Sequence, residues 1–339
     1  MSARRDPALV VQPAPFLRPT VTTPRVMRDV LVALVPSLAA AIWYFGISAI
    51  LVVATATLAA VATEWALARG PRGATLGDFS AVVTGVLVGL VLPPSFPLWM
   101  AALGGFVAMA LGKLAWGGLG HNLFNPALVG RAFLQAAFPI AITTWVPPQG
   151  PGALYKANLA WPFLTPPVDA LTAATPLGRM KFEAVGTPLA NLFFGRVSGT
   201  LGETSAVAIL IGLAWLLARR ACDWKIPAAT VASGALLAQL FHQISPQHYP
   251  GALFTILSGG FLFGTVFMAT DPVTSPLSPK GGVVFGAGIG VLVVLIRFWG
   301  GLPEGVMYAI LLMNAVSPLI DRALKPRAFG YGRRARVSP

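Results

Sequence analysis

Charged residues, cysteine and histidine are scarce in this sequence. Only 10% of the 339 residues are charged, and the chain has one cysteine and three histidines. A single cysteine excludes a disulfide, a four-cysteine iron–sulfur site and a cysteine-rich zinc site within the chain. The histidines, His121, His242 and His248, are too scattered to form a recognisable metal motif. We therefore predict no metal site and no catalytic side chain.

Nucleotide-binding fingerprints are also missing. The sequence has neither the Gly-x-Gly-x-x-Gly dinucleotide motif nor a P-loop, so any nicotinamide chemistry must belong to another protein. The net charge of +13 raises the question of nucleic acid, but the basic residues gather beside apolar runs. That distribution is an orientation signal for a membrane protein, and we predict no nucleic-acid partner.

Apolar residues dominate what is present. They make up 56% of the chain, more than a soluble domain of this length carries without large exposed apolar patches. We predict an all-α polytopic membrane protein with ten transmembrane helices, because a spanning helix needs about 20 apolar residues. The expected spans are 28–46, 47–68, 79–92, 98–116, 125–142, 204–218, 226–243, 252–269, 283–298 and 306–320.

Glycine and proline interrupt several of these runs. The chain has 36 glycines and 30 prolines, and such breaks are tolerated at membrane depth only where protein or water covers the backbone. The expected order is an N-terminal arm (1–27), five spans (28–142), a long loop (143–203), five spans (204–320) and a basic tail (321–339). A weak internal similarity around Asn125 and Asn314 would fit two five-helix repeats.

Arginine and lysine are concentrated on one predicted side of the membrane. They precede the first span and follow the second, sixth and tenth spans. By the positive-inside rule both termini are then cytoplasmic, and the 143–203 loop faces outward. The N-terminal arm lacks the apolar core of a signal peptide, so we expect it to be retained. The basic tail could contact anionic lipid headgroups or an acidic partner subunit.

The segment from Asp169 to Thr175 is the most informative part of the outer loop. Its sequence is Asp-Ala-Leu-Thr-Ala-Ala-Thr, followed by Pro176. Two small residues before Thr175 leave its hydroxyl unshielded, which suits enzymatic attachment of a large group. The alternative is an ordinary helix cap or turn. Arg179 and Lys181 are close enough in sequence to approach a phosphate, although solvated loop charges are the simpler interpretation.

Two further stretches carry polar side chains into apolar surroundings. In the first, Asn122 and Asn125 are spaced three apart, so we expect their amides to project to one side of a helical turn. Helix capping or an interhelical hydrogen bond is the alternative. In the second, Asp271 follows an apolar run and is either a helix-end cap or part of an ion path, and Asp78 occupies a similar setting before the third span.

These three motifs, taken together, resemble the RnfD and NqrB family of the Rnf and Na⁺-NQR respiratory complexes. The resemblance rests on Asp-x-x-Thr-x-Ala-Thr ending at Thr175, on Asn-x-x-Asn-Pro-Ala-Leu-x-x-Arg-Ala-Phe-Leu starting at Asn122, and on Met-Ala-Thr-Asp-Pro-Val around Asp271. One departure is Ala173, at a position usually held by glycine or serine.

The resemblance implies two cofactors. A flavin transferase would join FMN through its phosphate to Thr175, and riboflavin would bind without a covalent bond near Asn122 and Asn125. It also implies a fold similar to urea transporters.

As a function, the resemblance implies one subunit of an ion-translocating ferredoxin:NAD⁺ oxidoreductase in the inner membrane, inactive alone. The other Rnf subunits, membrane and peripheral, would handle ferredoxin and NAD, while this chain relays electrons coupled to Na⁺ or H⁺ transport. Two alternatives stay open from the residues alone, a passive solute channel or carrier and a purely structural scaffold.

Overall fold

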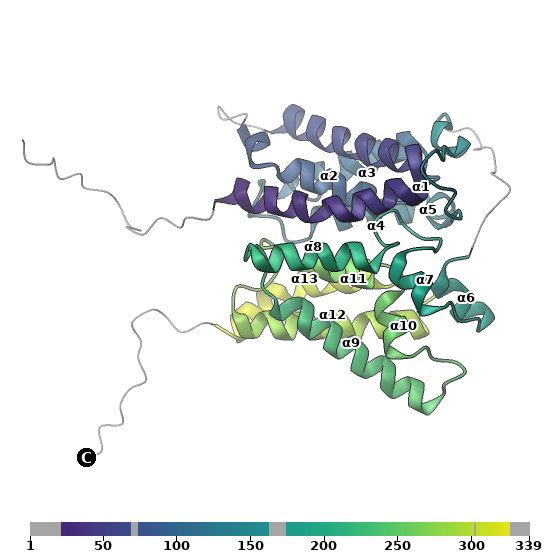
Figure 1. Ribbon diagram of the computed structural model, residues 1–339. Coiled ribbons are helices and arrows are strands. Elements are labelled where there is room, and N and C mark those ends of the chain that lie inside the picture. Colours follow the sequence, from purple (N-terminus) through teal and green to yellow (C-terminus); the bar gives the residue numbers. More distant parts are fainter. Residues whose placement is uncertain (1–21, 69–73, 163–173, 302, 326–339) are drawn as a thin grey trace, which may run out of the picture.

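The computed structural model describes residues 22–68, 74–162, 174–301 and 303–325. Every regular element in these ranges is helical, as the composition predicts. The N-terminal half, purple to blue in Figure 1, forms one layer, and the C-terminal half, green to yellow, forms the other. Helix α8 (Ala206–Ala218) packs against α1 (Thr23–Leu67), and α13 (Val306–Ala323) packs against α4 (Pro126–Ala137), which joins the two layers.

Helix α1 contains the first two expected spans. Its backbone is non-helical at Gly46, where φ is 62°, so the boundary expected after residue 46 is confirmed. A Cβ atom at Gly46 would collide with the backbone of Pro151 and Ala153, and Ser48 N donates to Ala153 O at 3.2 Å. Only glycine fits this turn, because both the positive φ and the close backbone exclude a side chain.

Two shorter helices complete the N-terminal layer with α4. Helix α2 (Ser80–Leu90) and helix α3 (Leu98–Ala110) both pack along α1. The short α5 (Pro139–Thr143) follows α4 after a break at Phe138, so the single span expected over 125–142 is divided in two.

The C-terminal layer is built around α9 (Lys225–Ile244) and α12 (Pro279–Trp299). A Cβ atom at Gly290 would lie within 2.9 Å of Gly234 N, so the two backbones approach closely at this crossing. Small residues allow such close approach between helices in membranes, where packing rather than water exclusion holds helices together.

The span expected over 252–269 is wrong as a continuous helix. Helix α10 (Ala252–Leu257) ends before Gly259, whose φ is 58°, and α11 (Phe261–Phe263) continues into a π-helical turn, η4 (Gly264–Met268). Helix α2 is also only 11 residues long, and Leu201 N and Gly202 N donate to Leu92 O and Leu90 O near its end. The neighbouring loop thus satisfies the carbonyls that a broken helix leaves open.

Four helical segments of the described residues are long and apolar enough to cross a membrane. They are Thr23–Leu67, Leu98–Trp116, Pro279–Trp299 and Val306–Ala323. The molecule is therefore consistent with a multi-pass membrane protein, but the structure does not confirm ten crossings or two repeats.

The remaining elements form the two ends of the bundle. The start of α1 and the end of α13 lie at one end, here called the terminal end, and α6 (Pro176–Glu183) and α7 (Leu189–Phe194) lie at the opposite, distal end (Figure 1). Short 3₁₀ turns at Ala74–Asp78, Leu114–Trp116 and Lys156–Leu159 fill the connections. Thr175, directly before α6, is therefore at the end opposite to the start of α1 and the end of α13.

Candidate functional site

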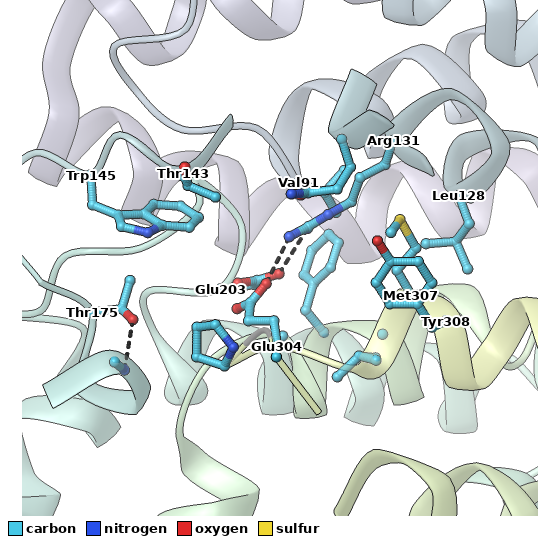
Figure 2. Close-up of a pocket in the computed structure, with 18 of the residues that line it drawn as sticks. Val91, Leu128, Arg131, Thr143, Trp145, Thr175, Glu203, Glu304, Met307 and Tyr308 are labelled. Atoms are coloured by element: carbon cyan, nitrogen blue, oxygen red, sulfur yellow. Dashed lines mark hydrogen bonds and ion pairs between the residues drawn. The ribbon is translucent and has the colours of Figure 1, made fainter. Parts of the chain in front are cut away.

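Thr175 lies at the wall of a cavity at the distal end. The cavity has a volume of about 380 Å³, and Figure 2 shows Thr175 below Trp145 on one side and charged side chains on the other. We call it the distal cavity. The threonine itself is only 8% exposed, so its hydroxyl is not the freely accessible loop group that the sequence suggests.

Thr175 is the N-cap of α6. Its Oγ1 accepts a hydrogen bond from Gly178 N at 3.1 Å, and Pro176 occupies the first helical position. This is the capping alternative raised by the sequence, and it places Oγ1 at the positive end of a helix dipole. The residues before Ala174, including Asp169 and Ala173, lie outside the described residues.

Helix α6 is held to the bundle at both ends. Leu177 is buried against Leu192 and Phe254, and Lys181 Nζ donates to Arg297 O at 2.8 Å and to Gly300 O at 2.5 Å. Lys181 therefore caps the C-terminal end of α12, where cations are favoured. Partial burial lowers the pKa of Lys181. Its ammonium is committed to these carbonyls, while Arg179 is exposed and pairs with Glu183 at 3.8 Å.

A charged triad, Arg131, Glu203 and Glu304, faces Thr175 across the distal cavity (Figure 2). Arg131 Nη1 lies 3.3 Å from Glu203 Oε1, and its Nη2 lies 2.7 Å from Glu304 Oε2. Arg131 comes from α4, Glu203 from the connection before α8, and Glu304 from the connection before α13. Arg131 stands inside the Asn-Pro motif in sequence, but nothing in the local pattern pointed to its two partners.

Two consecutive glycines make room for the carboxylates. A Cβ atom at Gly259 would lie 2.9 Å from Glu304 Oε1, and one at Gly260 would lie 2.5 Å from Glu203 Oε1. The break between α10 and α11 therefore lets the backbone pass beside the triad. This explains in physical terms why the predicted span 252–269 is interrupted here.

Asn122 and Asn125 lie at the terminal end and do not share a helical turn, contrary to expectation. Asn125 is the N-cap of α4, with Oδ1 accepting from Ala127 N at 3.0 Å and Nδ2 donating to Met268 O at 3.2 Å. Asn122 precedes the helix, and its Nδ2 donates to Phe124 O at 3.2 Å. The buried Asn122 Oδ1 has no hydrogen-bond partner within the described residues.

Both asparagines line a second, smaller cavity together with Asp271 and Lys113. Its volume is about 60 Å³, which is room for a few water molecules. Asp271 folds back on its own loop, accepting from Thr274 Oγ1 at 3.1 Å and from Val273 N at 3.4 Å. Burial raises the pKa of Asp271, and the two hydrogen bonds oppose that shift. We call this space the terminal cavity.

A buried polar chain runs beside the terminal cavity. Lys113 Nζ lies 2.5 Å from Glu64 Oε1 and donates to Ser80 Oγ at 2.5 Å. Ser80 Oγ in turn donates to Asp78 Oδ1 at 2.5 Å, and Asp78 also accepts from Ser80 N at 2.7 Å. Asp78 thus accepts the first backbone N–H of α2, a structural role that the sequence left open beside an ion path.

The fold and the two sites define a multi-pass membrane protein, helical throughout its described residues, with two cavities whose mainly apolar walls include buried charged and polar side chains. The sequence profile of the NQR2, RnfD, RnfE family matches residues 10–330. The chain belongs to this family.

Similar proteins cover nearly the whole chain, and each is the D component of a multi-subunit complex. The component from the ion-translocating oxidoreductase complex of Stutzerimonas stutzeri is 43% identical over 93% of this chain and 94% of that protein. Its counterpart in the proton-translocating ferredoxin:NAD(+) oxidoreductase complex of Clostridium ljungdahlii is 37% identical over 95% and 96%. The counterpart in the Na(+)-translocating ferredoxin:NAD(+) oxidoreductase complex of Acetobacterium woodii is also 37% identical, over 95% of each chain.

Proposed function

We propose that this chain is the flavin-carrying membrane subunit of an Rnf-type ion-translocating ferredoxin:NAD⁺ oxidoreductase. FMN would be joined through its phosphate to Thr175, and the subunit would relay electrons between ends of the membrane domain, inactive without its partner subunits. The observation that carries the proposal is the position of Thr175, with its hydroxyl at the wall of the distal cavity and at a helix N-terminus. Family membership and the names of the relatives support it.

The N-terminus of α6 suits a phosphodiester. A phosphate on Thr175 Oγ1 would stand at the N-terminus of α6, where the helix dipole favours negative charge. Gly178 N, which already points at Oγ1, is the nearest described donor. The short distance from attachment point to cavity would direct the rest of the cofactor inward.

The distal cavity has the size and lining that a flavin ring needs. Its 380 Å³ falls within the usual range of about 300–1,000 Å³ for small-molecule sites. Trp145, Phe182 and Tyr308 offer aromatic faces, and Val91, Leu128 and Met268 cover the inner wall. Bound there, FMN would supply one-electron and two-electron redox chemistry, while these residues orient the ring and limit water access.

Riboflavin at Asn122 and Asn125 fits the described terminal cavity poorly. A space of about 60 Å³ is far too small for the ring, and both the oxygen and the nitrogen of the Asn125 amide already form hydrogen bonds. The riboflavin therefore remains a prediction from the resemblance. Asn122 Oδ1, which has no hydrogen-bond partner among the described residues, is the group that supports this prediction. Extraction of non-covalent flavin from purified protein would test it.

The transported ion also remains a proposal. The relatives from Clostridium ljungdahlii and Acetobacterium woodii are each 37% identical to this chain. The complex of the first is named as proton-translocating and that of the second as Na⁺-translocating. Identity therefore does not select the ion. Asp271, at the wall of the terminal cavity, and Asp78, at the end of the buried polar chain, are the candidate ion-path residues.

The test is mass spectrometry of the peptide that contains Thr175, from protein made together with a flavin transferase. We expect the mass of an FMN adduct, and a denatured band that fluoresces in the gel. Thr175→Ala should abolish both, while Thr175→Ser should keep them because it retains the hydroxyl. Thr187→Ala, which removes a hydroxyl from the same region beyond α6, is the matched control.

An unmodified Thr175 in protein from its native complex would contradict the proposal. A purified chain that is colourless but carries solute downhill into liposomes would favour the channel alternative. Unchanged turnover of the assembled complex with Thr175→Ala would favour the scaffold alternative.

A further inference from the structure

The charged triad of the distal cavity is unbalanced. One guanidinium, that of Arg131, faces the carboxylates of both Glu203 and Glu304 (Figure 2). Arg131 and Glu203 are both buried, so water does little to compensate either charge. Arg131 is the one cation that pairs with both carboxylates within 4 Å among the described residues. Two anions that share one close cation in a medium of low dielectric constant favour the binding of a proton by one of them.

Glu203 is the less well compensated of the two carboxylates. The Arg131–Glu304 distance is 2.7 Å, whereas the Arg131–Glu203 distance is 3.3 Å. The Glu304 side chain is also 20% exposed to solvent. Arg297 also approaches Glu304, since Arg297 Nη2 and Glu304 Oε1 both lie within 3.3 Å of the Cβ position of Gly259. By contrast, Glu203 Oε2 is buried and has no hydrogen-bond partner among the described residues.

The other charged or titratable groups around the cavity do not fill this gap. Glu183 of α6 and Tyr308 of α13 line the same cavity, and Glu183 pairs with Arg179. Arg297 donates to Thr255 O at 2.5 Å and to Ser258 O at 2.9 Å. Lys181 donates to the α12 carbonyls. Glu203 Oε2 is therefore the acceptor in this cluster that a proton would satisfy.

We propose that Glu203 is the proton-binding site of the distal cavity and that it binds one proton for each electron that reaches a flavin held there. The proposal rests on the proposed attachment at Thr175. The electron comes from a one-electron carrier of a partner subunit, and the proton comes from water at the cavity mouth. An O–H bond of a hydronium ion breaks there and leaves water, and an O–H bond forms at Glu203 Oε2. When the electron leaves, the Glu203 O–H bond breaks and the proton returns to water.

The physical reason is charge conservation within a poorly solvated space. An electron adds a negative charge to the cavity, and a neighbouring carboxylate then binds a proton more tightly. In the pH range in which Glu203 is ionised before the electron arrives, uptake of one proton at Glu203 keeps the total charge of the cavity constant, while Arg131 holds the carboxyl in place. Electron arrival is thereby linked to proton uptake at the distal end.

The first measurement is the pH dependence of the midpoint potential of the covalent flavin in the purified complex, read by its absorbance. Linkage of one proton to one electron gives about 59 mV for each tenfold change in proton concentration. We expect E203Q to lower the measured slope by up to that amount over the pH range in which Glu203 titrates. E183Q, which changes a carboxylate lining the same cavity, should leave the slope unchanged.

The second measurement needs no flavin. Infrared pH-difference spectra of the T175A protein should contain the carbonyl band of a protonated carboxyl that E203Q removes and E183Q keeps. E203D, which keeps the carboxyl and shortens the side chain, should show a band at a shifted position. It therefore serves as a control in case E203Q loses the band because it misfolds.

The outcomes separate this inference from the proposed function. An unchanged slope in E203Q, or an infrared spectrum in which E203Q removes no band, would overturn the proton site. Protein without covalent flavin would overturn the proposed function, and the infrared measurement would still decide whether Glu203 binds a proton.

Discussion

Buried charged residues are the most unusual feature of this otherwise apolar helix bundle. Lys113 is 1% exposed and Glu64 is fully buried, and each depends on the other for compensation. Ionisable residues inside membrane proteins are rare and usually face the interior or mark a functional path. Their energetic roles can be separated by removing one partner or both.

Lys113→Met should destabilise the protein more than the double variant Lys113→Met, Glu64→Leu. The single change leaves Glu64 buried without its cation, which costs about 3–5 kcal/mol, whereas apolar replacement of both partners is often neutral. Denaturant unfolding in detergent measures the difference. If both variants lost the same stability, the pair would not be a compensated ion pair.

Cys222 should react slowly with alkylating reagents at neutral pH. It lies in the connection between α8 and α9, where burial and the charge of Asp223 raise the pKa of its thiol to about 11. Only the thiolate reacts, so the rate should rise about 100-fold between pH 7 and pH 9. A plateau below pH 9, followed by mass spectrometry, would show that the thiol ionises more easily than this environment allows.

At the residue scale, the sequence indicated local structure better than long-range contacts. Helix capping was the alternative interpretation for Thr175 and Asn125, each of which stands directly before a proline, and both are N-caps. The cofactor roles predicted for them stay predictions. The triad was not predicted, because Arg131 is separated from Glu203 by 72 positions and from Glu304 by 173. Only the fold brings them together, and a single sequence has no pattern that pairs them.

At the scale of elements, breaks in helices decide where polar groups can gather. Gly46 turns α1 back on itself, and Gly259 with Gly260 opens the space that Glu203 and Glu304 occupy. The sequence predicted such interruptions from its glycine and proline content but assigned 252–269 to one span. A π-helical turn and a short break have no reliable sequence signal, because hydropathy averages over them.

Gly46→Ala should be strongly destabilising, while Gly152→Ala at the same end of the bundle should be nearly neutral. Alanine at φ 62° costs about 1–2 kcal/mol, and the clash with the Pro151 and Ala153 backbone adds about 1–3 kcal/mol. No atom lies within 4 Å of a Cβ position at Gly152. Thermal unfolding in detergent compares them, and equal melting temperatures would show that the turn is not constrained.

At the scale of the whole molecule, the two cavities lie in different parts of the bundle. The distal cavity contains Thr175, and the terminal cavity lies near the start of α1, whose residues Val26 and Met27 line it. The start of α1 and the end of α13 lie at the end of the bundle opposite to Thr175. Which end faces the cytoplasm is a separate prediction.

Cysteine labelling should assign these ends. In a Cys222→Ser background, we expect a membrane-impermeant thiol reagent added outside intact cells to label a cysteine at Glu183 and not one at Arg322. The Glu183 side chain is 55% exposed, and Arg322 lies in the last turn of α13. The reverse pattern would place Thr175 in the cytoplasm and exclude a cofactor attached outside.

The burial of Thr175 has a consequence for biogenesis. A transferase has to bring the phosphate of its flavin substrate to the hydroxyl oxygen of Thr175. In the finished bundle, however, Thr175 is 8% exposed and its oxygen accepts a hydrogen bond from Gly178 N. Cofactor loading would therefore have to precede the docking of α6 by Lys181, or require its temporary release. Maturation would then be ordered in time, with the covalent step first and closure of the enclosing helix second.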